Sequence, residues 1–386
     1  MKRSFSTRMI AALSLAVLWS AISAQEPAPE TKKPAAKQTA REMEVCFVLD
    51  TTGSMSSLIQ GAKDKIWSIA NELATLKPAP KIKFGLIAYR DRKDAYVTKV
   101  FDLSDDIDAI YDHLMGFKAD GGGDTPESVN QALHEAVTKM SWSKGRRVAK
   151  LVFLVGDAPP HTDYPDDIQY PEICKLAMKK SLIINTIRCG NMQKTETVWN
   201  DIAQRAEGEY VSIAQSGGTI AVATPLDKEI AAVNAQLNGT IVCYGDHKEQ
   251  AAVRMKVANN AAAKAEAIAD RADFYRNLRC ATGGLGGKVV GGNNDLVEQI
   301  IQNKLTLKDV DAKKLSPEMQ KLSREEQLTA IKKNVEERQK LQAKIDELLK
   351  KRSVYLAREK ARLLAEGKGD SFDLKVKEIV REQSKR

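Results

Sequence analysis

The stretch 45–55 constrains the fold of this chain more than any other part. It begins with five consecutive apolar residues, which predict a strand buried on both faces, like the inner strands of a parallel sheet. The run stops at Asp50, hydroxyl side chains follow at Thr52 and Ser54, and a helical pattern comes next. Open α/β sheets bind ligands at the carboxyl ends of their strands. The stretch therefore predicts an α/β sheet with a cluster of oxygen ligands at one edge.

Apolar runs and helical patterns alternate through residues 43–235, which predicts one domain with a mostly parallel sheet covered by helices on both faces. Strands are expected at 44–50, 81–90, 97–103, 148–155, 182–187 and 209–214. Helices are expected at 56–76, 104–115 with Ser104 as N-cap, from Pro126 in a first turn to residue 140, at 173–180, 196–207 and 226–237. The fold class is a doubly wound, six-stranded α/β sheet followed by a C-terminal helical region.

Two later stretches add oxygen ligands to the same edge. The glycine-rich loop 121–127 delivers the hydroxyl of Thr125, and the second buried strand ends at Asp157. Carboxylate and hydroxyl oxygens suit Mg²⁺, Mn²⁺ or Ca²⁺. The alternative is that these residues only cap helices and loops, as Asp and Thr often do. Three segments that converge on one pattern favour the metal site.

This pattern resembles the von Willebrand factor A (VWA) domain and its metal-ion-dependent adhesion site. The family pattern, Asp-x-Ser/Thr-x-Ser followed by a distant Thr and a distant Asp, falls on Asp50, Thr52, Ser54, Thr125 and Asp157. The resemblance implies that Thr52 and Ser54 bind the ion directly, that Asp50 and Asp157 act largely through water, and that Thr125 joins when a ligand is bound. The first hydroxyl is Thr where Ser is commoner, and the oxygen is kept.

The resemblance implies an open coordination position that takes an Asp or Glu side chain of a partner protein. We therefore expect a metal-dependent adhesion or scaffold module of the cell envelope, with Mg²⁺, Mn²⁺ or Ca²⁺ as the cofactor and no enzymatic activity. A metal-dependent hydrolase is the alternative, because His161 and Asp163 follow the Asp157 loop. His161 is expected to be a surface loop residue, and no hydrolase motif is present. Some relatives serve a chaperone ATPase as partner or adaptor, which is a further alternative.

The first 24 residues have the organisation of a secretory signal peptide. Basic residues precede the apolar run 9–22, and small residues follow at Ser23 and Ala24. An uncut membrane anchor is the alternative, but the run is short for a spanning helix. We expect cleavage near Ala24 and an exported protein, periplasmic, at the cell surface or secreted, with no transmembrane segment in the mature chain. Residues 25–42, rich in Pro, Lys, Ala and Thr, predict a flexible linker.

Five cysteines are present, at positions 46, 174, 189, 243 and 280. Pairs can form in an oxidising compartment, but the odd count leaves at least one thiol unpaired within a monomer. Cys46 and Cys189 lie inside apolar strands and are expected to be core residues. No Cys-x-x-Cys spacing occurs, so a structural zinc site is not expected.

The sequence after the sheet predicts two further regions. Residues 236–310 are a helical and glycine-rich connecting region with one long helical stretch at 248–278. Its segment 282–292 lacks the residues of a phosphate-binding loop, so no nucleotide site is expected. Residues 311–386 form a helical tail that carries most of the net charge of +9.

The apolar spacing in the tail slips near Leu328 and Leu341, which predicts a helical hairpin or short coiled coil. A short amphipathic segment, 372–380, ends the chain. Self-association through these helices is expected. Basic helices can also bind nucleic acid, but export argues against a nucleic-acid target.

Overall fold

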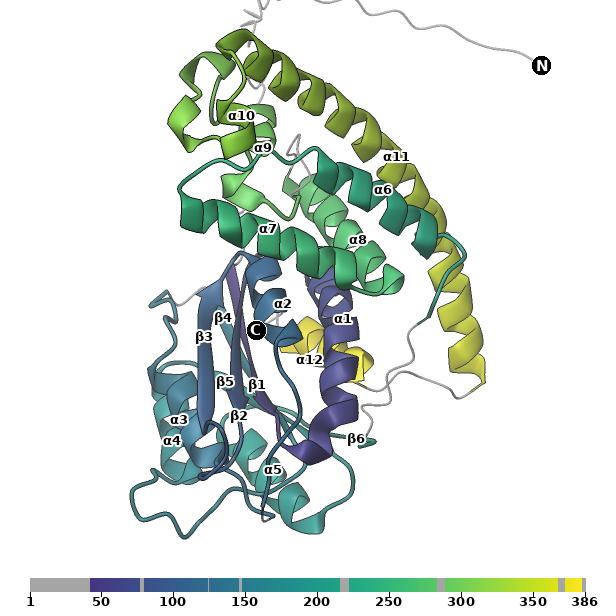
Figure 1. The fold of residues 1–386 in the computed structure, drawn as a ribbon. Helices are drawn as coiled ribbons and strands as arrows, with labels where there is room; N and C mark the ends of the chain where they lie inside the picture. The colour runs from purple at the N-terminus through teal and green to yellow at the C-terminus, as the bar shows by residue number, and fades with distance from the viewer. Residues whose placement is uncertain are drawn as a thin grey trace, which may run out of the picture. The chain divides into compact units, whose positions relative to one another are not determined.

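The six expected strands form a single sheet in the order β3-β2-β1-β4-β5-β6 (Figure 1). β3 pairs antiparallel with β2, and every other neighbouring pair is parallel. The strands are β1 (Glu42–Asp50), β2 (Lys81–Tyr89), β3 (Thr98–Ser104), β4 (Val148–Gly156), β5 (Ile183–Cys189) and β6 (Tyr210–Ile213). The predicted α/β fold class is confirmed, and β3 lies at an edge of the sheet.

The computed structural model describes residues 42–76, 80–123, 125–145, 148–215, 222–282, 289–366 and 372–383. The predicted signal peptide at 1–24 and all but the last residue of the predicted linker at 25–42 lie outside these ranges. So does most of the glycine-rich segment 282–292. The ranges from residue 42 onward lie within one compact unit.

β1 occupies the middle of the sheet, between β2 and β4. Its side chains alternate between two cores, with Val45, Phe47 and Leu49 in one and Cys46 and Val48 in the other. This alternation explains why the strand reads as an unbroken apolar run: both of its faces are covered.

Helices cover both faces of the sheet (Figure 1). One face packs against α1 (Ser56–Ala74), α2 (Ile107–Met115) and α12 (Phe372–Gln383), and the other against α3 (Val129–Thr138), α4 (Tyr170–Lys179) and α5 (Gln193–Arg205). A short 3₁₀ turn, η1 (Gly53–Met55), connects β1 to α1.

Two predicted helix starts are wrong. α2 is capped by Asp106, whose side chain accepts from the Ala109 amide, while Ser104 ends β3 and accepts from the Asp106 amide. α3 begins at Val129, so Pro126 lies outside it. The reason is that Glu127 forms a parallel bridge with Pro160, which holds this part of the chain extended before the helix begins.

The predicted helical stretch 248–278 is two helices. α7 (His247–Ala262) starts with a capping box between Asp246 and Glu249, and its C-cap residue Ala263 is extended. α8 (Ala265–Thr282) then runs beside α1. The rest of this helical region comprises α6 (Asp227–Gly239), η2 (Gly292–Asn294), α9 (Leu296–Ile301), η3 (Leu307–Asp309), η4 (Ala312–Lys314), α10 (Pro317–Gln320) and α11 (Arg324–Ala365).

The hairpin or short coiled coil predicted for the tail is wrong, because α11 is one continuous helix of 42 residues. Its buried face changes partners along its length. Ile331 packs in a cluster with Leu296 of α9, whereas Leu341 and Ile345 pack against α6 and α8. A helix that contacts different neighbours in turn has no single apolar stripe, which explains the slips in the spacing.

The last helix, α12, returns to the sheet and lies beside α1 (Figure 1). Val376, Ile379 and Val380 are buried in the core that also contains Val45 and Phe47 of β1. The Gln383 side chain exchanges two amide hydrogen bonds with Asn185 in β5, of 2.9 and 2.7 Å. The predicted amphipathic segment is therefore confirmed as a helix, and it completes the cover on one face of the sheet.

Ion pairs join the helical region to the sheet domain. The guanidinium of Arg271 in α8 donates two hydrogen bonds, of 2.6 and 2.7 Å, to the carboxylate of Asp108 in α2, and Tyr275 donates a third. All three side chains are buried. Moving α8 along α2 would separate Arg271 from Asp108 and leave a buried charge without its partner, which is strongly destabilising. The ion pair therefore fixes the position of α8 on α2.

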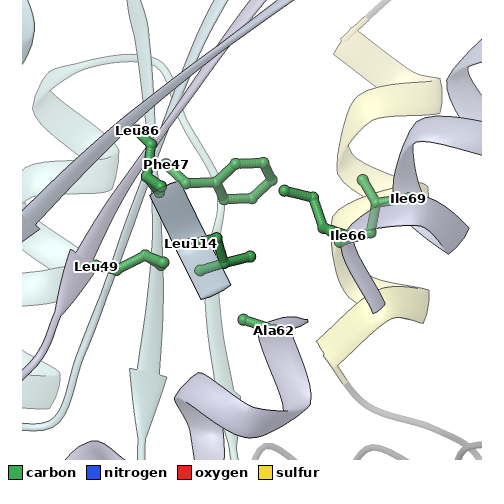
Figure 2. A pocket seen from close by; sticks show the side chains of 7 residues that line it. All are labelled: Phe47, Leu49, Ala62, Ile66, Ile69, Leu86 and Leu114. Atoms are coloured by element: carbon green, nitrogen blue, oxygen red, sulfur yellow. The ribbon is translucent and has the colours of Figure 1, made fainter. Parts of the chain in front are cut away.

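A small apolar cavity of about 20 Å³ lies between the sheet, α1 and α2 (Figure 2). It is lined by Phe47, Leu49, Ala62, Ile66, Ile69, Leu86 and Leu114. The lining offers no polar partner to a water molecule, so the cavity is a small packing gap in the core.

All five cysteines are free thiols, with Cys46, Cys174 and Cys189 buried, so the expected core positions of Cys46 and Cys189 are confirmed. Across the described ranges, no helix combines the length and apolar content needed to span a bilayer.

We expect Ile379→Ala to lower the free energy of unfolding by roughly 2–5 kcal/mol, because it leaves a cavity between α12 and the sheet. Urea titration followed by circular dichroism measures the change. Glu378→Ala is the control on the same helix, where an exposed side chain pairs with Lys375. We expect this control to stay within about 0.5 kcal/mol of wild type. Equal losses in both variants would show that α12 is not docked.

Candidate metal centre

The structure gathers four of the five predicted site residues at the carboxyl ends of β1 and β4. Asp50 ends β1, and Asp157 follows the last residue of β4. Thr52 and Ser54 lie in the turn after β1, with their hydroxyl oxygens 3.4 Å apart. Asp50 and Thr52 are fully buried, Asp157 is half-buried and Ser54 is exposed. The cluster is therefore buried on the strand side and open to solvent at Ser54.

The Thr52 hydroxyl has the orientation that a cation ligand needs. It donates to Asp50 Oδ1 at 2.6 Å, and the Thr52 amide donates to the same oxygen at 2.9 Å. Because the hydroxyl proton is directed at Asp50, the oxygen lone pairs remain available to a cation. Asp50 Oδ2 is buried and accepts no hydrogen bond from any residue that the structure describes.

Gly156 allows β4 to approach β1 closely at this point. A Cβ at this position would lie 2.3 Å from the Tyr89 hydroxyl oxygen and 3.3 Å from Asp50 Oδ2. Tyr89 and Asp50 fill the space that a side chain at position 156 would need, so only glycine fits there.

Gln215, just after β6, links the two strand ends. Its side-chain amide donates to Asp157 Oδ2 at 2.6 Å and to the Ser54 carbonyl at 3.2 Å. The predicted site did not include this residue. A lone glutamine after a short strand carries no sequence signal for a metal site.

The loop that carries Thr125 passes over the same turn. Gly121 and Gly122 have positive φ values of 79° and 84°, which favour glycine, and the Gly53 amide donates to the Gly121 carbonyl at 3.2 Å. A Cβ on Gly122 would lie 3.5 Å from Thr52 Cβ. Thr125 itself is exposed on this loop. The structure thus places the loop on Thr52 and leaves the Thr125 side chain at the solvent side.

Glu127 is a buried carboxylate that the predicted site omits. It is 3% exposed, and its Oε2 accepts no hydrogen bond within the described part of the chain. Burial, reinforced by the charges of Asp50, Asp91 and other nearby carboxylates, raises its pKa to about 9. In sequence, a glutamate just before a helix is most simply interpreted as a favourable charge at the helix N-terminus, so its place in the cluster becomes visible only in three dimensions.

Burial also raises the pKa of Asp50, to about 7, and the charge of Asp157 adds to the effect. Hydrogen bonds from Thr52 and the charge of Arg90 oppose the rise without cancelling it. Two carboxylates, Asp50 and Glu127, are therefore costly to ionise in the protein alone. A cation at this position would remove that cost, since it supplies the missing positive charge.

The donors present fit a hard divalent cation held mainly by hydroxyl oxygens. Within the described ranges, no three His, Cys, Asp or Glu side chains are arranged to hold an ion by themselves. The residues that would hold it directly are Thr52 and Ser54, with the carboxylates of Asp50 and Asp157 behind them. This division matches what the family resemblance implies, and the role of the five residues as metal ligands stays a prediction.

His161 is buried, not on the surface as predicted. Its Nδ1 lies 2.7 Å from an Asp163 oxygen, its Nε2 lies 3.4 Å from Asp91 Oδ2, and its ring stacks on Tyr164. Tyr164 and Ser128 also donate to the Asp91 carboxylate. The histidine thus joins the loop after β4 to the loop after β2.

We expect the metal-free protein to lose stability as the pH rises. The folded pKa values of Asp50 and Glu127 lie above their usual values of about 4, so between about pH 4 and 9 the folded state binds more protons than the unfolded state. Thermal unfolding in EDTA from about pH 5.5 to 8.5 should show a falling Tm, because the free energy of unfolding falls by up to about 1.4 kcal/mol per pH unit for each group.

Asp50→Asn should reduce this slope, because the neutral side chain no longer titrates. Saturating Mg²⁺ should reduce it in wild type as well. A Tm in EDTA that rises with pH over the same range would contradict the prediction.

Comparisons with known proteins concern the sheet domain as a whole. Residues 44–225 match the family model described as von Willebrand factor A domain. Over 119 residues the chain is 27% identical to an ariadne-like RING finger protein of Acanthamoeba polyphaga mimivirus, a match that spans 31% of this chain and 11% of that protein. The family match and the strand order together support a VWA domain in this part of the chain.

Solved structures with a similar fold include the SpRpn10 VWA domain, with 14% identity, a TM-score of 0.35 and coverage of 46% of this chain and 89% of that chain. An aerotolerance-related membrane protein of Bacteroides fragilis has 14% identity, a TM-score of 0.31 and coverage of 45% and 92%. Proximal thread matrix protein 1 of the mussel byssus has 17% identity, a TM-score of 0.35 and coverage of 46% and 42%. Likeness at this level supports no argument about function.

Proposed function

We propose that the von Willebrand factor A domain at residues 44–225 is a protein-binding module that recognises an acidic side chain of its partner through a divalent ion. VWA domains are generally protein-interaction modules, and the proposal is of a binding protein, not an enzyme. The observation that carries it is the buried, unpartnered Oδ2 of Asp50 behind the hydroxyls of Thr52 and Ser54. The ion is Mg²⁺, with Mn²⁺ or Ca²⁺ as substitutes.

Charge balance supports an acidic partner. Thr52 and Ser54 are neutral, and Asp50 and Asp157 are proposed to lie behind water molecules, so the residues in direct contact leave the ion's charge largely exposed. A carboxylate from a partner therefore gains more here than at a site already filled with carboxylates. The exposed position of Ser54 leaves a path for that group.

Thr125 is proposed to move onto the ion when the partner binds. Its exposed side chain and the two left-handed glycines before it, Gly121 and Gly122, give the loop a backbone that can adopt more than one conformation.

The surrounding loops would decide which partner fits. Arg92 donates to Asp166 at 2.8 Å and to Asp167 at 2.7 Å, and its guanidinium lies over the Tyr164 ring. These contacts tie the loop after β2 to the loop after β4, so the rim of the site is built in advance. A built rim favours specific recognition over general adhesion.

We expect isothermal titration to show that the wild type binds Mg²⁺ and Mn²⁺ and that Asp50→Ala weakens binding about 10- to 100-fold, because the hydroxyl of Thr52 loses the carboxylate that orients it. Asp102→Ala is the control, since Asp102 lies on the edge strand β3 and accepts from Ser141. Equal binding by wild type and Asp50→Ala would contradict the metal assignment.

Partner binding should depend on both the ion and Thr125. We expect a pull-down from the source's cell envelope to recover partners in Mg²⁺, and to lose them in EDTA and with Thr125→Ala. Recovery of the same partners under all three conditions would move recognition away from the metal site, to the C-terminal helices, through which self-association is also proposed.

We propose that the protein is exported to the periplasm, the cell surface or the medium, from the signal-peptide pattern at 1–24. Amino-terminal sequencing of the protein from its source should give a mature chain that begins near Gln25. A chain that still begins at Met1 in the cytoplasm would contradict export and favour the alternative role as partner of a chaperone ATPase.

A further inference from the structure

We propose that Glu127 is a further carboxylate of the metal centre, which acts behind the ion together with Asp50 and Asp157. This inference rests on the proposed function, because it concerns the same ion. It adds a residue outside the five-residue pattern, and it assigns the residue a charge role rather than a structural one.

The backbone of Glu127 is fixed against the loop that carries Asp157. Its amide donates to the Pro159 carbonyl at 2.9 Å, and the His161 amide donates to its carbonyl at 3.1 Å. These two bonds make the parallel bridge to Pro160. The position of the Glu127 side chain is therefore set by the same segment that positions one of the predicted ligands.

The side chain points toward the turn that carries Thr52. A Cβ on Gly122 would lie 3.6 Å from Glu127 Oε1 and 3.5 Å from Thr52 Cβ, so the carboxylate and Thr52 face the same glycine. Because Gly122 has no side chain, nothing from this residue separates them.

The carboxylate of Glu127 has no positively charged partner among the residues that the structure describes. Among the described residues, the buried Oε2 of Glu127 accepts no hydrogen bond, and the charges that act most strongly on its carboxylate are those of neighbouring carboxylates such as Asp50 and Asp91. The cation on the neighbouring segment, Arg90, donates to the carbonyls of Thr51 and Lys118. A buried carboxylate without a partner costs stability unless a positive charge is supplied. A divalent ion held by Thr52 and Ser54 would supply it.

A structural role predicts something different. Glu135, on the following helix, is also buried, and its Oε2 likewise accepts no hydrogen bond from the described residues, but its Oε1 accepts from the Lys139 cation at 2.8 Å and from Gln131 at 3.2 Å. A glutamate held in this way stabilises the protein through its own partners. Glu135 is therefore a matched control for Glu127.

The experiment compares wild type with Glu127→Gln, Glu127→Asp and Glu135→Gln. Isothermal titration measures Mg²⁺ and Mn²⁺ affinity, and thermal unfolding is followed in EDTA and in saturating Mg²⁺. We expect Glu127→Gln to bind both ions about 10- to 100-fold more weakly and to melt higher than wild type in EDTA. The uncharged amide relieves the crowding of carboxylates and no longer attracts the ion. Glu127→Asp keeps the charge and should bind the ions more tightly than the Gln variant.

Glu135→Gln should lose stability in EDTA and keep wild-type affinity for both ions. The inference is overturned if Glu127→Gln binds Mg²⁺ as wild type does, or melts lower than wild type in EDTA. If Glu127→Gln does not fold, Glu127→Ala decides: weaker binding of both ions supports the inference, and wild-type affinity overturns it. If the wild type binds neither ion, the proposed metal dependence is contradicted. If the wild type and Glu127→Gln bind the ions equally well, only the role of Glu127 is contradicted.

Discussion

The burial of the Asp50 carboxylate at the end of the central strand is the constraint on which the site depends. β1 lies between β2 and β4, so its last residue has strand neighbours on both sides and no access to solvent. A charge in that position requires compensation, and Thr52 supplies only part of it through two hydrogen bonds. The strand order and the missing side chain at Gly156 increase this cost, because both bring the carboxylate of Asp157 next to Asp50. At this edge of the sheet, the residues that the structure describes compensate the buried carboxylate only in part.

The helical region is attached at the other end of α1. This helix begins beside the site at Ser56 and spans roughly 28 Å at 1.5 Å per residue. Near its end, Asn71 accepts from Asn277 and donates to Asp273, both in α8. α11 then packs on α6, α8 and α9, and the chain ends with α12 beside α1. Helices after residue 226 thus pack against α1. The first residue of α1 directly follows the turn that contains Ser54. α1 therefore contacts both regions, because α8 and α12 pack against it and its first residue adjoins the site.

Much of the sheet could be predicted from sequence because its strands are buried on both faces and therefore read as apolar runs. The five-residue pattern could be found for the same reason, since each member follows such a run or a glycine-rich loop. The errors arise where tertiary contacts decide the outcome. His161 lies in a polar loop, which suggested an exposed side chain. It is buried because Asp91, from a distant part of the sequence, and Tyr164, from the same loop, pack against its ring. The shifting face of α11 could not be inferred without knowing α6, α8 and α9 as its neighbours. The position of α12 depends on contacts with distant residues, such as Asn185, which lies about two hundred residues before its partner Gln383.

Glu127 and the neutral hydroxyls have opposite effects on two affinities of the proposed site, the affinity for the ion and the affinity for an acidic partner. Carboxylates placed behind an ion hold it more tightly but reduce what an incoming acid gains, because part of the ion's charge is already balanced. Hydroxyls on the solvent side of the ion bind it less tightly, but they leave more of its charge to attract an incoming acid. Burial places Asp50 and Glu127 on the inner side, whereas Ser54 and Thr125 are exposed. In this arrangement the inner carboxylates would retain the ion between encounters, and the outer hydroxyls would leave its solvent side electrophilic. Affinity for the ion and affinity for an acidic partner are thus set by different layers of one site, so substitutions in each layer can separate the two.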